Sequence, residues 1–133
     1  MLHAMLDTNV CVRALRDKPK GFRDRFRSET GSLAISTIVL FELHHGVVKS
    51  QQPKLHREEL EAFLARLIIL PFDGEAAEHA GHIKAVLERK GQIIGPNDIL
   101  IASHARSLGL KLITGNLGEF TRVDGLCCED WLT

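Results

Sequence analysis

Acidic side chains in this sequence recur where apolar runs end or apolar helices begin. Carboxylate oxygens are the ligands that hard divalent cations such as Mg²⁺ prefer in proteins. A bound ion of this kind lowers the pKa of a water molecule and offsets the charge that develops on phosphate oxygens. The pattern therefore makes metal-assisted hydrolysis of a phosphodiester a working hypothesis. The candidates are Asp7, Glu42, Asp98 and Glu119, with Asn116 close to the last of them.

Most of these residues have an ordinary structural explanation when each is taken singly. Asp7 precedes a predicted helix and could cap it, which is a common use of aspartate. Asp98 follows Gly95-Pro96 at the start of an apolar helix, where it could stabilise the positive end of the helix dipole. Asn116 and Glu119 fall on a predicted loop, where polar residues are usually solvated. Only their joint placement favours a common site.

Glu42 is unusual because it interrupts the most apolar helix of the sequence. A carboxylate buried there without a partner would cost several kcal/mol. The alternative is an exposed stripe shared with His45 and Lys49, three and seven residues further on. Glu42 and His45 also form a Glu-x-x-His motif, but a carboxylate-bridged di-iron site needs two such motifs and no second one is present.

Short apolar runs alternate with helical patterns, which predicts right-handed βαβ units around a mainly parallel sheet of the α/β class. In such a sheet, functional groups gather where the carboxyl ends of the strands open into loops. Asp7 and Asn116 both fall just after predicted strands. Strands are expected over residues 2–6, 33–35, 68–70, 111–114 and 126–128, and helices over 10–15, 19–28, 38–48, 55–67, 75–90 and 96–108.

Two of these elements are expected to be buried. The helix over 38–48 is apolar nearly all round, which is typical of a buried helix. The strand over 68–70 is a continuous apolar run, so it is also predicted to lie inside the sheet.

The composition is that of an ordinary globular protein. The chain has 133 residues, with 44% hydrophobic and 26% charged residues, so we expect a single domain spanning residues 1–133. No apolar run is long enough to cross a membrane, and the first residues lack the features of a signal peptide, so a cytoplasmic location is expected. The three cysteines show no zinc-site spacing and are predicted to be reduced thiols.

The formal net charge is zero, but its distribution is uneven. Residues 13–27 have a local charge of +5, which would suit contact with phosphates. The alternative is a solvated helix face. The residues proposed for this phosphate contact are Arg13, Lys18, Lys20 and Arg23, within a set that also includes Arg16, Arg25 and Arg27.

An ordered series of short motifs resembles the PIN-domain family, in particular the VapC-type toxins of bacterial toxin–antitoxin pairs. The resemblance extends over the whole chain in the expected order and spacing. Each motif is weak alone, whereas the ordered set is specific. The motifs are Met5-Leu6-Asp7-Thr8-Asn9; Ser36 with Glu42-Leu43 and Gly46; Gly95-Pro96 with Asp98 and Ile99-Leu100-Ile101-Ala102; and Leu112-Ile113-Thr114 with Asn116, Glu119 and Phe120.

The resemblance implies a Rossmann-like three-layer α/β/α sandwich and an endoribonuclease that uses Mg²⁺ or Mn²⁺. It implies a toxin that inhibits translation by cutting RNA, with tRNA, such as initiator tRNA cut in the anticodon stem-loop, as the expected substrate. It also implies a homodimer and a VapB-type antitoxin that blocks the site. A larger toxin–antitoxin assembly would bind operator DNA through the antitoxin.

The same resemblance assigns roles to individual residues. Asp7 and Asp98 would be the principal metal ligands, and Glu42 would complete the acidic cluster. Asn116 stands where the family often has aspartate, which leaves open whether Asn116 or Glu119 fills the fourth position of the acidic site. The supporting hydrogen-bonding residues would be Asn116, Thr8 and Thr114.

Three other functions compete with this interpretation. A phosphatase of the haloacid-dehalogenase type needs Asp-x-Asp after the first strand, whereas the sequence has Asp7-Thr8-Asn9. A receiver-type signalling domain would use Asp73 as phospho-acceptor with Lys111 nearby, but it leaves Glu42 and Asp98 unexplained. A catalytically inactive PIN fold that serves as a binding module would require an assay to distinguish it from the enzyme.

Overall fold

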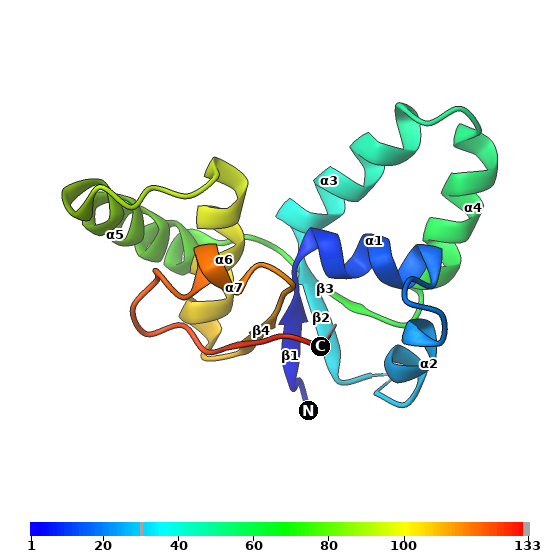
Figure 1. Cartoon of the computed structure of the whole chain (residues 1–133), viewed down its shortest axis with the longest axis horizontal. Helices are drawn as coiled ribbons and strands as arrows, with labels where there is room; N and C mark the ends of the chain where they lie inside the picture. The colour runs from blue at the N-terminus through cyan, green and yellow to red at the C-terminus, as the bar shows by residue number, and fades with distance from the viewer. Residues whose placement is uncertain (30, 132–133) are drawn as a thin grey trace.

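The computed structural model describes residues 1–29 and 31–131 and contains a five-stranded sheet. The strand order is β3-β2-β1-β4-β5, and every neighbouring pair is parallel (Figure 1). The predicted parallel sheet is therefore confirmed. The strands are β1 (Ala4–Leu6), β2 (Leu33–Ser36), β3 (Ile68–Leu70), β4 (Lys111–Ile113) and β5 (Cys128–Glu129).

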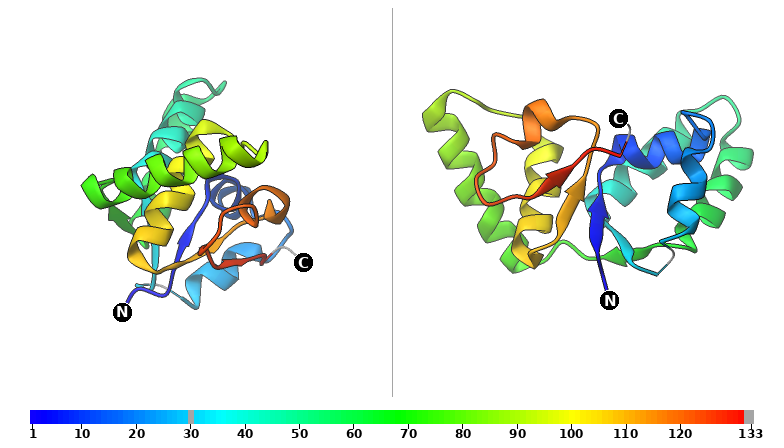
Figure 2. Two further views of the ribbon diagram at one scale, coloured as in Figure 1. Left: turned by 90° about the vertical axis from the view of Figure 1, so that its left-hand side faces the viewer. Right: turned by 60° about the horizontal axis from the view of Figure 1, so that its bottom comes forward.

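Helices cover both faces of this sheet, which gives the expected three-layer α/β/α sandwich. Helices α1 to α4 lie on one side of the sheet, and α5 and α6 lie on the other (Figures 1 and 2). Helices α3 and α4 form an antiparallel arm that projects beyond the strand ends (Figure 1). The helices are α1 (Thr8–Arg16), α2 (Phe22–Arg27), α3 (Thr37–Val48), α4 (Pro53–Leu64), α5 (Gly74–Lys90), α6 (Pro96–Leu108) and α7 (Leu117–Phe120).

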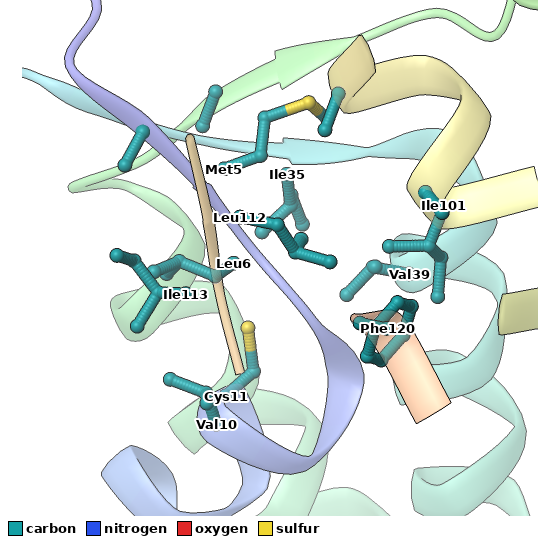
Figure 3. Close-up of a cluster of buried hydrophobic side chains, with 14 of the residues drawn as sticks. Met5, Leu6, Val10, Cys11, Ile35, Val39, Ile101, Leu112, Ile113 and Phe120 are labelled. Carbon is teal, nitrogen blue, oxygen red and sulfur yellow. The ribbon is translucent and has the colours of Figure 1, made fainter. Parts of the chain in front are cut away.

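The core joins the central strands to the helices that surround the strand ends. Leu6, Leu112 and Ile113 are fully buried in β1 and β4. Figure 3 shows Val39 of α3, Ile101 of α6 and Phe120 of α7 gathered beside these strands. Burial of apolar side chains of this size supplies about 1.5–3 kcal/mol each. This packing therefore fixes the positions of α3, α6 and α7, which carry residues of the candidate site.

The register of the two central strands brings two later site residues side by side. Leu6 pairs with Ile113, and the backbone N–H of Asp7 donates to the carbonyl of Ile113 at 3.1 Å. The ladder thus continues one step beyond β1. As a result, Asp7 and Thr114, which are 107 residues apart in sequence, meet at the carboxyl end of the sheet.

The two burial predictions were wrong. Helix α3 buries only Val39 and Leu43, while Phe41 and Val48 are 61% and 75% exposed. Strand β3 lies at the edge of the sheet, so Ile68 and Ile69 are also exposed. Apolar composition alone could not distinguish a core element from one that leaves an apolar face uncovered.

Several local boundaries also differ from the prediction. Helix α2 begins at Phe22 rather than at Pro19, because residues 17–21 form a turn closed by a hydrogen bond from the Arg23 N–H to Asp17. The short helix α7 falls in the segment that was expected to be a loop. The cysteines are free thiols, as expected. Within residues 1–29 and 31–131, no helix has both the length and the apolar character needed to span a membrane.

Candidate active site

Asp7 lies at the point where β1 ends and α1 begins, and only 3% of the residue is exposed to solvent. One carboxylate oxygen accepts from the Val10 N–H at 2.9 Å, and the other accepts from the Thr114 hydroxyl. The capping role foreseen for Asp7 is therefore real, and it leaves the carboxylate fixed in place. Burial raises the pKa of Asp7, with the charges of Glu42 and Asp130 adding to this effect against the two hydrogen bonds.

Asp98 lies in the first turn of α6 and is only partly buried. Gly95 makes room for it, because a Cβ atom at Gly95 would stand 3.1 Å from Asp98 Oδ2. Burial is the main cause that raises the pKa of Asp98 to about 7. A hydrogen bond from the Asp98 carboxyl to Glu119, and the charges of Glu119, Glu42 and Asp7, raise it further.

Glu42 points from the middle of α3 toward the start of α1 and α6. Its Oε1 accepts from the Thr8 hydroxyl, and its Oε2 accepts from Asn97 Nδ2 at 3.2 Å. The Glu42 carboxylate therefore has hydrogen-bond partners on two other helices, α1 and α6. These partners explain how the apolar helix α3 tolerates a carboxylate. His45 does not share in this cluster and instead stacks on Phe41 at a ring distance of 6.5 Å.

Glu119 lies on α7, and Asn116 is the residue that precedes this helix. Asn116 Nδ2 donates to Glu119 Oε2 at 2.9 Å, while the Asn116 N–H donates to the Thr114 hydroxyl at 2.9 Å. Because Thr114 in turn donates to Asp7, these contacts connect α7 to β1 through β4. Asn116 thus orients Glu119, which is the residue that hydrogen-bonds to Asp98.

The four carboxyl groups form one acidic cluster at the carboxyl end of the sheet. In the part of the chain that the structure describes, no lysine, arginine or histidine forms an ion pair with any of them. Among the described residues, no group of three aspartate, glutamate, histidine or cysteine side chains is arranged so that it could hold a metal ion by itself. A small number of carboxylates without counter-charge fits Mg²⁺, which keeps several water ligands and is bound by one or two carboxylates.

Two residues near the cluster were missed by the sequence reasoning. Asn97 donates to Glu42, although the sequence had given it no role. Asp130, beyond β5, is close enough for its charge to raise the pKa of Asp7. Asn97 could have been suspected from its position beside Asp98. Asp130 could not, because it approaches Asp7 only through the pairing of β5 with β4, and the sequence does not indicate that pairing.

The basic residues divide into two groups. Arg13 and Lys18 line a cavity of about 580 Å³ that reaches Asn116. Arg23 is instead bound to the protein itself, since its guanidinium donates to the last backbone carbonyls of α1. Lys20 is exposed in the turn before α2 and lies outside the lining of this cavity.

The groups that a receiver domain would use are engaged elsewhere. Asp73 caps α5 by accepting from the Ala76 N–H at 3.0 Å. Lys111 pairs with Glu129 at 2.7 Å. Neither residue belongs to the acidic cluster, so the structure gives no support to a phospho-acceptor site.

The comparison with known families agrees with this geometry. Residues 4–126 match the PIN domain family. The chain belongs to the PIN-domain family. PIN-domain nucleases generally depend on a divalent metal ion. Among curated relatives, this PIN domain is 46% identical over 131 residues to the tRNA(fMet)-specific endonuclease VapC of Shigella flexneri, covering 98% of the chain and 99% of the relative. It is 43% identical over 132 residues to ribonuclease VapC2 of Haemophilus influenzae, covering 99% of the chain and all of the relative.

A solved structure shares the same fold. This PIN domain superposes on a chain of the DNA-bound VapBC complex from Salmonella typhimurium with a TM-score of 0.93. The two chains are 46% identical, and the match covers 98% of this PIN domain and 99% of that chain. The expected family and fold are thereby confirmed.

Proposed function

We propose that this PIN domain is a metal-dependent endoribonuclease and the toxic component of a type II toxin–antitoxin system. The observation that supports this most directly is the convergence of Asp7, Glu42, Asp98 and Glu119 at the carboxyl end of the sheet. Relatives that match nearly the full length of the chain are named endonuclease or ribonuclease VapC, which supports the same activity.

The donor set suits Mg²⁺ or Mn²⁺, with Asp7 and Asp98 as the residues that would hold the ion. When bound, the ion supplies Lewis-acid stabilisation of the negative charge that develops on the phosphate. Thr114 and the Val10 N–H keep the Asp7 carboxylate in one orientation. Thr8 and Asn97 do the same for Glu42.

Glu119 would handle the proton of the reaction, because Asp98 beside it would be occupied by the ion. The carboxyl groups of Asp98 and Glu119 are close enough to interact directly. Glu119, held by Asn116, would accept the proton of a water molecule that attacks the phosphodiester in line with the departing 3′ oxygen.

A tRNA is the substrate that we infer, and initiator tRNA cut in the anticodon stem-loop is the specific candidate. The name of the Shigella relative, which is specific for tRNA(fMet), supports this choice at 46% identity. A hairpin loop is also suitable on physical grounds, because unstacked single-stranded nucleotides can enter a site that a helical duplex cannot.

A VapB-type antitoxin is the protein partner that we infer. Phe41 and Val48 on α3 and Leu55 on α4 are exposed apolar side chains of the arm that these two helices form, and such patches commonly mark protein interfaces. We also infer a homodimer and a larger complex that binds operator DNA through the antitoxin. Light scattering of the purified chain, alone and with a co-expressed antitoxin, tests the stoichiometry. A monomer that fails to retain any antitoxin would contradict this part.

The activity is tested with the full chain and a 5′-labelled initiator tRNA in Mg²⁺, in Mn²⁺ and with EDTA. Cleavage is expected with either ion and not with EDTA. Asp7→Asn and Asp98→Asn should each abolish it while leaving the circular dichroism spectrum unchanged. Glu58→Gln, which removes an exposed carboxylate on α4, is the matched control. Absence of cleavage by the wild-type chain on every RNA would instead favour an inactive PIN binding module.

A further inference from the structure

A fifth carboxyl group lies beside the acidic cluster, at the point where β5 ends. Asp130 follows β5 directly and is partly buried. Burial is the main cause that raises the pKa of Asp7, and the negative charge of Asp130 adds to it. Asp130 therefore opposes the ionisation of Asp7, which is a cost to the metal-free fold. A local conflict of this kind is typical of a functional site.

The pairing of the strands places Asp130 in one row of the sheet with Asp7. The preceding row consists of paired residues from β1, β4 and β5, namely Leu6, Ile113 and Glu129. The next residue of each strand forms the following row, which is Asp7, Thr114 and Asp130. The Asp7 N–H donates to β4 at 3.1 Å and the Thr114 N–H donates to β5 at 3.0 Å, so the hydrogen-bond ladder extends to this row. The three residues therefore lie at the same edge of the sheet.

Strand alternation directs the Asp130 side chain to the face on which the Asp7 carboxylate lies. Successive side chains of a strand point to opposite faces. Glu129 accepts from the Trp131 indole N–H at 3.0 Å, so these two side chains share one face. Asp130 lies between them and points to the opposite face. Asp7 and Thr114 follow the same row of the sheet, alternate in the same way and join through a side-chain hydrogen bond.

Both sequence neighbours of Asp130 are anchored to the rest of the fold. Glu129 forms an ion pair with Lys111 at 2.7 Å. Trp131 is only 7% exposed, and its ring packs against that of Phe26 on α2, with the centroids 5.7 Å apart. Strand β5 is too short to order this segment through its backbone alone, so these side-chain contacts fix it. Asp130 is therefore held in place from both sides.

The spacing of the row suits a contact through water. Neighbouring strands lie about 4.8 Å apart, so the backbones of Asp7 and Asp130 are about 10 Å apart. Because side chains stand roughly perpendicular to a sheet, the two carboxyl groups stay apart and are not placed to bind one ion directly. In protein sites, however, Mg²⁺ keeps several water ligands, which extend its reach. A carboxylate at the distance of Asp130 can accept hydrogen bonds from such waters.

We propose that Asp130 is a positioning residue of the site, which accepts hydrogen bonds from water ligands of the divalent ion held by Asp7. The proposal rests on the metal-dependent ribonuclease function proposed above. It adds a fifth acid to the four of the cluster, and it assigns a purpose to the anchored segment 128–131. Through the waters, Asp130 would fix the orientation of the hydrated ion on the β5 side of Asp7.

Binding of Mn²⁺ to the full chain without RNA is the primary test, because it does not depend on cleavage. The electron paramagnetic resonance signal of free Mn²⁺ gives the dissociation constant. Asp130→Asn should bind Mn²⁺ about tenfold more weakly than the wild type, since partners of metal ligands typically change metal affinity by about 10–100-fold. Asp130→Glu, which keeps an acceptor carboxylate, should recover part of the loss. Asp24→Asn, which removes an exposed acid of α2, is the matched control and should bind as the wild type does.

Salt distinguishes a contact through water from the general field of the Asp130 charge. The Debye length falls from about 8 Å at 0.15 M salt to about 3 Å at 1 M, so a long-range effect would be screened at the higher concentration. A contact through bound water lies inside the site and is much less screened. The wild-type and Asp130→Asn dissociation constants should therefore still differ about tenfold in 1 M KCl.

Equal Mn²⁺ affinities of the wild type and Asp130→Asn, or a difference that vanishes in 1 M KCl, would overturn the proposal. So would an equal loss in Asp24→Asn. These outcomes leave the ribonuclease assignment intact, because Mn²⁺ binding and RNA cleavage by the wild-type chain are measured first. A wild-type chain that neither binds Mn²⁺ nor cuts RNA would remove the proposed function itself.

Discussion

Replacing Asp98 by asparagine should stabilise the metal-free protein while it abolishes cleavage. In the native state, ionised Asp98 must coexist with Glu119, Glu42 and Asp7 in a partly buried place, and its pKa accordingly rises from the ordinary 3.8 to about 7. The unfolded chain has no such penalty. Asparagine keeps a donor for Glu119 and removes the charge, so the native state no longer contains the repulsion.

The magnitude follows from the pKa. A pKa difference of one unit corresponds to about 1.36 kcal/mol, so the rise from 3.8 to about 7 sets an upper limit of roughly 4 kcal/mol above pH 7. Because Asp98 is only partly buried, screening by water reduces this to about 1–2 kcal/mol. For a folded-state pKa that is raised, the penalty of an acid is absent below pH 4, grows between pH 4 and 7, and is complete above pH 7.

Thermal unfolding of the full chain in EDTA at pH 8 and at pH 5 measures the effect. Asp98→Asn should melt roughly 3–8 °C above the wild type at pH 8, and the gap should narrow at pH 5. Mg²⁺ should raise the melting temperature of the wild type and have a smaller effect on the variant. Glu58→Gln, on exposed α4, should show neither trend. An Asp98→Asn protein that is destabilised by the same amount at both pH values would refute the electrostatic reasoning.

Three further predictions concern single side chains. Thr114→Val leaves one Asp7 oxygen without its donor, so it should lower the unfolding free energy by about 1–3 kcal/mol and slow cleavage, as chemical denaturation and single-turnover assays would show. Burial lowers the pKa of His104 below its ordinary 6.5, so stability from the neutral ring should be lost as pH falls below 6.5, and His104→Leu should make melting less sensitive to pH in that range. Asp73→Ala removes the cap of α5 and should cost about 1 kcal/mol by denaturation, with cleavage unchanged.

The sequence was informative about the fold because strand and helix signals alternate clearly. The Gly95-Pro96 start of α6 and the Gly109 end of the same helix were both readable from residue type alone. What could not be read was the lateral order of the strands. The sequence does not say that β1 lies between β2 and β4, and the edge position of β3 follows only from that order. The wrong expectation that Ile68 is buried has this cause.

The acidic residues were found from the sequence, whereas the groups that hold them were found only in part. Thr8 and Thr114 were expected as neighbours, and both donate to carboxylates of the cluster. Asn97 was missed because it and Glu42 lie on different helices and are 55 residues apart in the sequence. The relation of Asn116 to Glu119 was left open in the sequence. In the structure the amide holds the acid instead of replacing it.

The electrostatics of the acidic cluster connect the stability of the protein to its proposed function. A fold selected for stability alone would not gather four carboxyl groups beside one another without counter-charge, and local conflicts of this kind are typical of functional sites. Hydrogen bonds from Thr8, Thr114 and Asn116 orient these groups but leave their mutual repulsion in place. A divalent cation would offset that repulsion, and the cavity lined by Arg13, Lys18 and Asn116 would attract phosphates of the substrate. The acidic cluster and the two arginines of this cavity, Arg13 and Arg16, would therefore serve the same polyanionic substrate.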